Sequence, residues 1–270
     1  MNKHFLELSF EGAVNQNVIN KSVMQVVSIE SCPFNFLTLS TPSPCPMDDS
    51  HRLFLQHFLQ HPVLEALKLK ELYMLCTQSP SFGKESFTSF LKVVNDQLSL
   101  LDLCIRRGNC HVTGELFFVL CNLAPDVASC EFGLGESTKS DLLIIRQILR
   151  AICCTAKKRC TSIELLNTCG RHLTDKRKIE SLLERLVQDQ WLHRRSDYFY
   201  LGIRSTVELG SWLEAEFIFP KCQVCKEFVS GGRFCRRDGT CESPSHVHCL
   251  EKLLGDNEEA RCVACTRMHE

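Results

Sequence analysis

The last fifty residues constrain the fold more than any other part of this 270-residue chain. Thiolates and imidazoles are the ligands that zinc prefers in proteins, and a C-x-x-C turn lets two thiolates reach one metal ion. Eight such residues stand in four pairs in this stretch: Cys222 with Cys225, Cys235 with Cys241, His246 with Cys249, and Cys262 with Cys265. A segment this short cannot bury a useful apolar core, so we expect metal binding to supply its folding energy.

The ligand order, four cysteines, one histidine and three cysteines, is that of modules that fold as a cross-brace, in which alternate pairs share a metal ion. The first zinc ion would then be held by Cys222, Cys225, His246 and Cys249. The second would be held by Cys235, Cys241, Cys262 and Cys265. His248 competes with His246 for the imidazole position, but only His246 keeps two residues before Cys249. We therefore predict two zinc ions and no catalytic side chain.

Two classes of module share this ligand order, the PHD finger and the variant RING domain. PHD fingers usually carry an aromatic residue two positions before the seventh ligand, where this chain has Ala260. RING domains present an apolar patch to a ubiquitin-conjugating enzyme, and the corresponding positions here are Val224, Leu253 or Leu254, and Val263. The residues favour the RING class.

The remaining cysteines do not indicate a secreted disulfide scaffold. The chain has 18 cysteines, and those before the C-terminal module show no paired spacing apart from Cys153 and Cys154. Cys76, Cys104 and Cys121 lie in apolar runs and resemble small buried hydrophobic residues. No signal peptide is recognisable, and no apolar stretch approaches the length of a membrane-spanning helix. A reducing compartment follows, and a formal net charge of -1 excludes a whole-chain electrostatic footprint for nucleic acid.

Residues 1–46 are predicted to be a poorly ordered extension, because three prolines lie among serines and threonines between Thr38 and Ser50. Val23 to Ile29 could form a short strand, and translation could begin at Met47.

Residues 47–135 are predicted to form a winged-helix domain. Apolar residues at three- and four-residue steps indicate helices from His51 to Pro62, from Val63 to Ser79, and from Lys84 onwards. The alternation from Leu103 to Leu120 indicates a hairpin with Gly108 and Asn109 at its turn.

The same order recurs in residues 136–217, which we predict to be a second winged helix. One amphipathic helix covers 142–152, a short one covers 162–167, and Asp175 can cap a third. A hairpin at 191–201 and a last helix at 204–217 lead into the zinc module, 218–270. The expected fold is mainly α with small β-hairpins: tandem winged-helix domains followed by a zinc-binding, cross-brace, RING-like domain.

Basic residues at the start of the third helix of this second domain could contact DNA phosphates, namely Lys176, Arg177 and Lys178. Acidic residues on the same helix dilute the charge, and winged helices also dock proteins. A solvated face or a protein-docking surface is favoured over direct DNA reading.

Three segments together resemble the non-SMC element 1 family of the structural-maintenance-of-chromosomes 5/6 complex. They are His51 to Leu72, Ile179 to Leu192, and the pattern CQVC…CESPSHVHC…CVAC. The resemblance implies a nuclear, chromosome-associated subunit in DNA repair by homologous recombination. It also implies a RING-type ubiquitin ligase whose activity depends on a partner. Its partners would be a MAGE-family subunit, a kleisin subunit and a ubiquitin-conjugating enzyme, with DNA reached through the complex and no membrane contact.

Two departures from that family bear on the ligase. The loop between Cys235 and Cys241 is longer than the family pattern, and Val263 stands where many RING domains have proline. Both affect recruitment of the conjugating enzyme more than zinc binding. The alternative function is a non-catalytic assembly or DNA-docking subunit whose zinc module is a protein-interaction surface.

Overall fold

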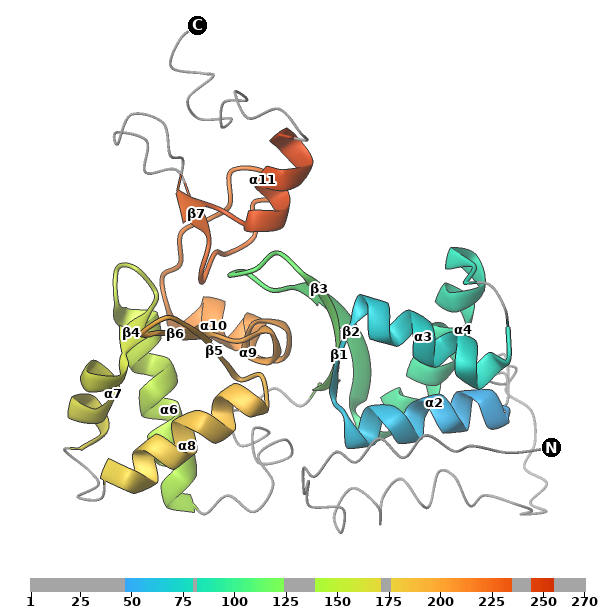
Figure 1. The fold of residues 1–270 in the computed structure, drawn as a ribbon, viewed down its shortest axis with the longest axis horizontal. Coiled ribbons are helices and arrows are strands. Elements are labelled where there is room, and N and C mark those ends of the chain that lie inside the picture. The colour runs from blue at the N-terminus through green and yellow to red at the C-terminus, as the bar shows by residue number, and fades with distance from the viewer. Residues whose placement is uncertain (1–46, 80–81, 124–138, 171–175, 235–243, 255–270) are drawn as a thin grey trace, which may run out of the picture. The chain divides into compact units, whose positions relative to one another are not determined.

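The structure, a computed structural model, describes residues 47–79, 82–123, 139–170, 176–234 and 244–254. All of them belong to one compact unit, Pro44–Glu270. Helices dominate and the sheets are small and antiparallel (Figure 1), which confirms the expected mainly α-helical class. The predicted extension at 1–46 and its possible strand lie outside the described residues. Within the described ranges, no helix has the length and apolar character needed to cross a membrane.

The first core is built from helices at the N-terminal end of the described chain. They are α2 (Asp49–Gln60), α3 (Ala66–Thr77), α4 (Lys84–Leu98) and the short 3-10 helix η1 (Ser99–Leu101). The side chain of Asp48 accepts a hydrogen bond from the backbone N–H of His51 at 3.0 Å, which starts α2. Phe54, Phe58 and Val94 are fully buried between the helices. The predicted apolar faces of α2 and α4 therefore form this core.

A three-stranded antiparallel sheet covers the helices of the first core. Its strands are β1 (Val63–Glu65), β2 (Leu103–Asn109) and β3 (Leu116–Asn122), in the order β1-β3-β2. The prediction of a helix beginning at Val63 was wrong, because Val63 and Leu64 pair with Val119 and Phe118 of β3. The apolar spacing also predicted that Leu67 and Leu75 lie on the buried face of that helix, but they are 68% and 72% exposed.

The predicted hairpin forms, but its turn lies further along the chain. Gly108 pairs with Phe117 within the sheet, and residues 110–115 make the connection. A Cβ atom on Gly108 would lie 2.3 Å from Cγ2 of Val207. Gly108 is therefore required for the close approach of another helix and does not form a turn.

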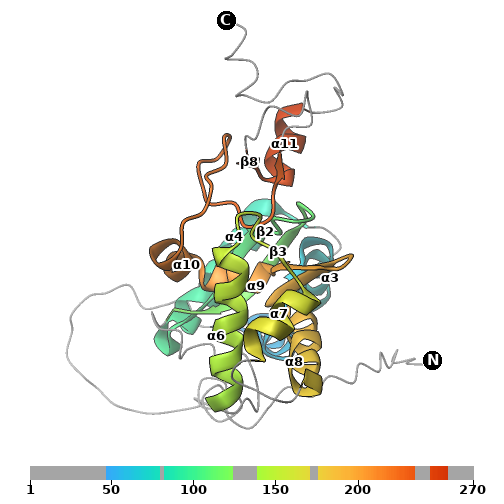
Figure 2. The same ribbon diagram turned by 90° about the vertical axis from the view of Figure 1, so that its left-hand side faces the viewer.

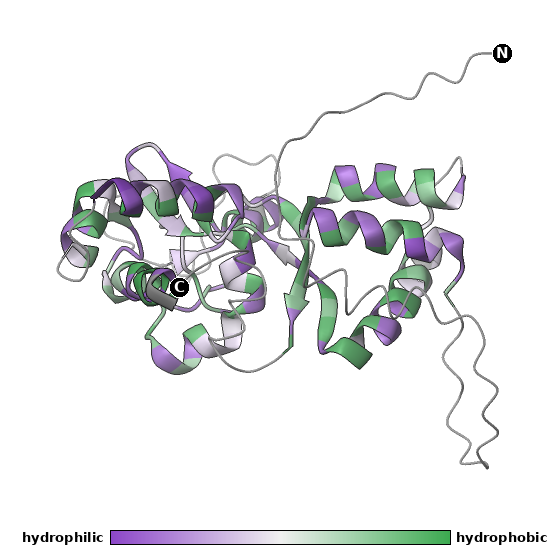
Figure 3. Ribbon diagram, turned by 90° about the horizontal axis from the view of Figure 1, so that it is seen from below, coloured by the Kyte–Doolittle hydropathy of each residue, from purple (hydrophilic) through white to green (hydrophobic). Residues whose placement is uncertain are grey.

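The second core again combines helices with a small sheet (Figure 1), and its helices face the viewer in Figure 2. Its elements are α6 (Lys139–Cys154), β4 (Cys160–Thr161), α7 (Ser162–Cys169), α8 (Lys176–Gln188), β5 (Leu192–Arg195) and β6 (Tyr198–Leu201). The strand order is β4-β6-β5, with all pairs antiparallel. The predicted stripe of α8 is buried at Ile179, Leu182, Leu183 and Leu186. Hydrophobic and hydrophilic residues form separate bands on these helices (Figure 3), as amphipathic packing requires.

The helix predicted at 204–217 is divided into α9 (Ile203–Glu208) and α10 (Gly210–Glu216). Ile203 of α9 packs against Val119 and Cys121 of β3, so α9 touches the sheet of the first core. The N–H of Asn122 donates to Oε1 of Glu208 at 3.2 Å. The helix is interrupted at Leu209 because α9 packs on the first core while Leu209 and Leu213 belong to the second.

The C-terminal segment follows α10. Near its start, Phe219 and Phe228 still pack in the second core. Its elements are β7 (Arg233–Phe234), β8 (Pro244–Ser245) and α11 (Val247–Leu254). The two strands pair antiparallel, with Phe234 opposite Pro244. This pairing places His246 directly before the first turn of α11.

Candidate metal centre

The first cysteine pair lies in a tight turn closed by backbone hydrogen bonds. Lys221 forms a β-bridge with Phe228, and the N–H of Cys222 donates to the carbonyl of Glu227 at 2.8 Å. The N–H of Lys226 donates back to the carbonyl of Cys222 at 3.0 Å, and Lys226 has a positive φ of 67°. The sulfurs of Cys222 and Cys225 are thereby brought to one side of a loop.

The second pair comes from the start of α11. His246 precedes the helix, and its carbonyl accepts from the N–H of Leu250 at 3.0 Å. Cys249 therefore lies one helical turn after His246, and the two side chains share a face.

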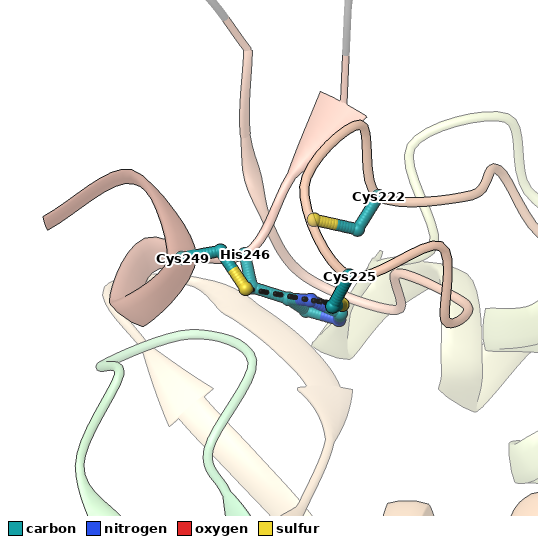
Figure 4. Close-up of side chains that lie close together, drawn as sticks. All are labelled: Cys222, Cys225, His246 and Cys249. Carbon is teal, nitrogen blue, oxygen red and sulfur yellow. Dashed lines mark hydrogen bonds between the residues drawn. The ribbon is translucent and has the colours of Figure 1, made fainter. Parts of the chain in front are cut away.

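Four side chains converge at this place: Cys222, Cys225, His246 and Cys249 (Figure 4). Their ligand atoms all lie within 4.8 Å of one another. Nδ1 of His246 is 3.3 Å from the sulfur of Cys225 and 3.8 Å from that of Cys249. Tetrahedral binding with bonds of about 2.0–2.3 Å places the ligand atoms roughly 3.3–3.8 Å apart. The cluster could therefore hold one metal ion.

A hydrogen bond fixes which nitrogen of His246 faces the cysteines. Nε2 of His246 lies 2.9 Å from the carbonyl oxygen of Phe228, which can only accept, so Nε2 carries the proton. Nδ1 is left with its lone pair toward the sulfurs. Burial lowers the pKa of His246, whose side chain is almost fully buried, and the ring is therefore neutral near pH 7. This is the orientation and tautomer that metal ligation needs.

The three thiols cannot all ionise in so small a space without a cation. Burial raises the pKa of Cys225, and burial together with hydrogen bonding to Cys225 raises that of Cys249 to about 12. Burial also works against the Cys222 thiolate, but hydrogen bonds from backbone amides around it outweigh burial and hold its pKa below the ordinary value. A bound metal ion would supply the missing positive charge.

His248, the competing histidine, does not join the cluster. Its ring stacks on that of His246 with centroids 5.0 Å apart. Burial lowers its pKa to about 4, and repulsion from His246, wherever that ring is protonated, adds to the shift. The structure thus brings His246, and not His248, to the cysteines.

The other predicted ligands, Cys235, Cys241, Cys262 and Cys265, lie outside the described residues, as do Ala260 and Val263. Of the predicted contacts to a conjugating enzyme, Val224 is 38% exposed and Leu253 is 45% exposed. Leu254 is the last residue of α11. Apolar side chains therefore reach the surface inside the first cysteine pair and on α11.

The basic residues proposed to contact DNA begin α8. Lys176, Arg177 and Lys178 are all exposed. Nζ of Lys178 forms an ion pair with Oδ1 of Asp141 at 2.8 Å, which neutralises part of this charge.

Two groups beside the cluster were missed by the sequence interpretation. The carbonyl of Phe228 fixes His246, and His111 lies next to it with ring centroids 4.3 Å apart. Burial lowers the pKa of His111 to about 3, with His246 and His248 adding to the effect, so its ring is neutral. No spacing rule connects residue 111 to residue 246, and only folding brings them together.

Both the sequence and the fold of this chain resemble those of known proteins. Residues 51–168 match the family model described as the Nse1 non-SMC component of the SMC5-6 complex. A human protein named non-structural maintenance of chromosomes element 1 homolog is 26% identical over 227 residues, which cover 81% of this chain and 83% of the relative. The Xenopus laevis protein of that name is 24% identical over 227 residues, covering 81% and 82%.

The fold also resembles that of solved structures. A chain in a structure titled Nse1-Nse3-Nse4 complex has a TM-score of 0.64 and 23% sequence identity, and the match covers 78% of this chain and 92% of that one. The likeness supports the fold described above.

Proposed function

We propose that this chain, which belongs to the Nse1 family of non-SMC components of the SMC5-6 complex, is a zinc-dependent RING-type ubiquitin ligase subunit of such a complex. The convergence of Cys222, Cys225, His246 and Cys249 is the observation that carries the proposal. These ligands join two sequence pairs separated by the intervening residues 226–245. A metal that joins a first pair to a third pair is what a cross-brace requires.

Zinc fits this donor set best. Three thiolates and one imidazole suit a borderline-soft ion without redox chemistry, whereas calcium and magnesium prefer oxygen ligands. All four protein positions are filled, so the site is of the closed, structural kind. Cys222, Cys249 and His246 are buried, whereas Cys225 is exposed, so water has little access to three of the four ligands. We further propose a second zinc ion on Cys235, Cys241, Cys262 and Cys265.

The ligase activity would come from positioning. A RING module holds a charged ubiquitin-conjugating enzyme so that a substrate lysine attacks its thioester, and the gain in rate comes from proximity and orientation. The reactive cysteine belongs to the conjugating enzyme. We propose that Val224 and Leu253, both exposed, form the contact surface together with Leu254 and Val263. Exposed apolar residues on a small module are suited to such a docking role.

The partners follow from the family. The similar solved chain comes from a structure whose title names Nse1, Nse3 and Nse4. We propose that this chain assembles in the same way with a MAGE-family subunit and a kleisin subunit, through winged-helix domains at 47–135 and 136–217. Its place would be on chromosomes in the nucleus, in DNA repair by recombination. Direct phosphate contacts by Lys176 and Arg177 stay a prediction.

An autoubiquitination assay tests the ligase directly. The full chain, with and without its MAGE-family partner, is incubated with a panel of ubiquitin-conjugating enzymes. Val224→Ala should slow product formation about five- to tenfold, because deleting two methyl groups from an apolar contact costs roughly 1–1.5 kcal/mol. Ile163→Ala, a change at a 70% exposed apolar residue of α7, serves as the matched control and should keep wild-type activity.

The alternative, non-catalytic function predicts a different result in the same assay. If the zinc-loaded wild-type chain forms no product with any enzyme tested, alone or with the partner, while the complex still assembles, the ligase proposal fails. The chain is then a non-catalytic assembly subunit whose zinc module is an interaction surface.

A further inference from the structure

We propose that His111, at the tip of the hairpin between β2 and β3, is a positioning residue for the metal ligand His246. The hairpin tip is defined here as residues 110–115. It lies on the first core, more than one hundred residues before the cluster in sequence. The inference rests on the proposed zinc site and adds to it a support from a distant part of the chain.

Hydrogen bonds join His111 to the segment Phe228–Ser230 beside the cluster. Nδ1 of His111 accepts from the backbone N–H of Ser230 at 3.2 Å and lies 2.8 Å from Oγ of the same serine. A backbone N–H can only donate, so Nδ1 is unprotonated and the serine hydroxyl donates to it as well. Ser230 is completely buried. The contact is therefore shielded from water, where a hydrogen bond has its largest effect.

The same segment binds the metal ligand His246 through Phe228, two residues before Ser230. The carbonyl of Phe228 accepts from Nε2 of His246 at 2.9 Å. His111 therefore binds residues 228–230 at Ser230, and the same residues bind His246 through the carbonyl of Phe228. Val229, between them, is fixed by a 2.8 Å hydrogen bond from its N–H to the carbonyl of Pro220. Displacing Ser230 would shift the carbonyl that sets the tautomer of His246.

The rings add a direct contact. The centroid of the His111 ring lies 4.3 Å from that of His246 and 5.3 Å from that of Phe228, with the latter pair edge to face. His111 therefore restricts both the rotation of the His246 ring and the position of the Phe228 carbonyl to which that ring donates.

Glycines on both sides permit this close approach. Gly114 in the tip has a positive φ of 86°, and a Cβ on it would lie 3.1 Å from Cγ1 of Val247 in α11. A Cβ on Gly231 would lie 2.9 Å from Cγ2 of Val112. The tip is itself held in shape, because the N–H of Gly114 donates to the carbonyl of Cys110 at 2.8 Å. The contact is a close-packed junction between two rigid turns.

The test measures how fast the full chain gives up its metal. The zinc-loaded protein is mixed with excess chromogenic chelator, and the phase belonging to this ion is the one that Cys249→Ser abolishes. Residues that orient a metal ligand typically contribute 10–100-fold to metal affinity. His111→Leu should accelerate this phase at least about tenfold. His111→Asn, whose side-chain oxygen can replace Nδ1 as acceptor, should bring the rate back to within about threefold of wild type.

Thr113→Ala is the control at the same tip, because its hydroxyl bonds only to Glu115 among the contacts that the structure gives, and its rate should equal wild type. Cobalt substitution gives a second readout, since the ligand-field bands should shift in His111→Leu and not in Thr113→Ala. Ser230→Ala takes the place of His111→Leu if the latter does not fold. Equal rates for His111→Leu and wild type, or for His111→Asn and His111→Leu, would overturn the inference. A wild-type chain that takes up no zinc would instead overturn the proposed function.

Discussion

Replacing Cys249 by serine is expected to remove one zinc ion and to unfold the start of α11. The Cys249 side chain is 5% exposed and packs with Cys222 and Val229. Water therefore cannot solvate its thiolate in place of the metal ion. Zinc binding contributes about 10–16 kcal/mol to the folding of small zinc modules. Loss of one thiolate ligand should remove most of that contribution at this site. Hydrogen exchange of residues 247–254 should approach the rate of an unfolded peptide.

Cys154→Ser provides the matched control. Cys154 is a free cysteine of α6 that is exposed to solvent and does not belong to the cluster. Its replacement should change stability by less than about 0.5 kcal/mol and leave exchange in α11 unchanged. Unchanged exchange in Cys249→Ser would mean that the segment folds without the metal, which contradicts the account.

Glu208→Ala is expected to destabilise the chain by about 3–5 kcal/mol, because it removes the carboxylate that pairs with a buried guanidinium. Oε2 of Glu208 accepts from Nε of Arg204 at 3.2 Å, and both side chains are almost fully buried. Oε1 accepts from the N–H of Asn122. The guanidinium also lies over the ring of Trp191, 4.5 Å from its centroid. Chemical unfolding followed by circular dichroism measures the loss.

The loss of stability should come from the buried charge of Arg204 once the Glu208 carboxylate is removed. It should not come from a large net attraction between the two residues. Burial raises the pKa of Glu208 even though Arg204 lowers it, so removing these charges from water costs about as much as their attraction returns. The double variant Arg204→Met with Glu208→Leu should therefore lie within about 1 kcal/mol of wild type. Glu214→Ala removes the exposed pair with Lys221 and should cost less than about 1 kcal/mol. A double variant as unstable as Glu208→Ala would refute this explanation.

Strong periodicity predicted the helices that pack one face against a core. The apolar pattern selected Phe87, Phe90, Leu91, Val94, Leu98 and Leu101. All of them except Leu91 and Leu101, which are partly buried, are buried in the structure. The pattern failed at Val63 and Leu64, because two adjacent apolar positions fit a strand as well as a helical turn, and pairing with β3 decides between them. Gly108 looked like a turn residue since its packing partner, Val207, is remote in sequence.

The candidate metal site, too, could be predicted from the sequence only in part. The spacing of C-x-x-C and H-x-x-C selects Cys222, Cys225, His246 and Cys249, because each pair is a local geometric unit and the structure joins the two units. The support by His111 and Ser230 has no local signature. It depends on a hairpin of the first core reaching the cluster, which only the folded chain shows.

Metal stoichiometry of the intact chain tests the central claim most directly. Native mass spectrometry of the full chain, purified under reducing conditions, should show two zinc ions per chain, one of them held by Cys222, Cys225, His246 and Cys249. The same measurement on Cys249→Ser should show one. A wild-type chain that retains no zinc would contradict the account, because the cluster would then be a set of buried thiols and not a metal centre.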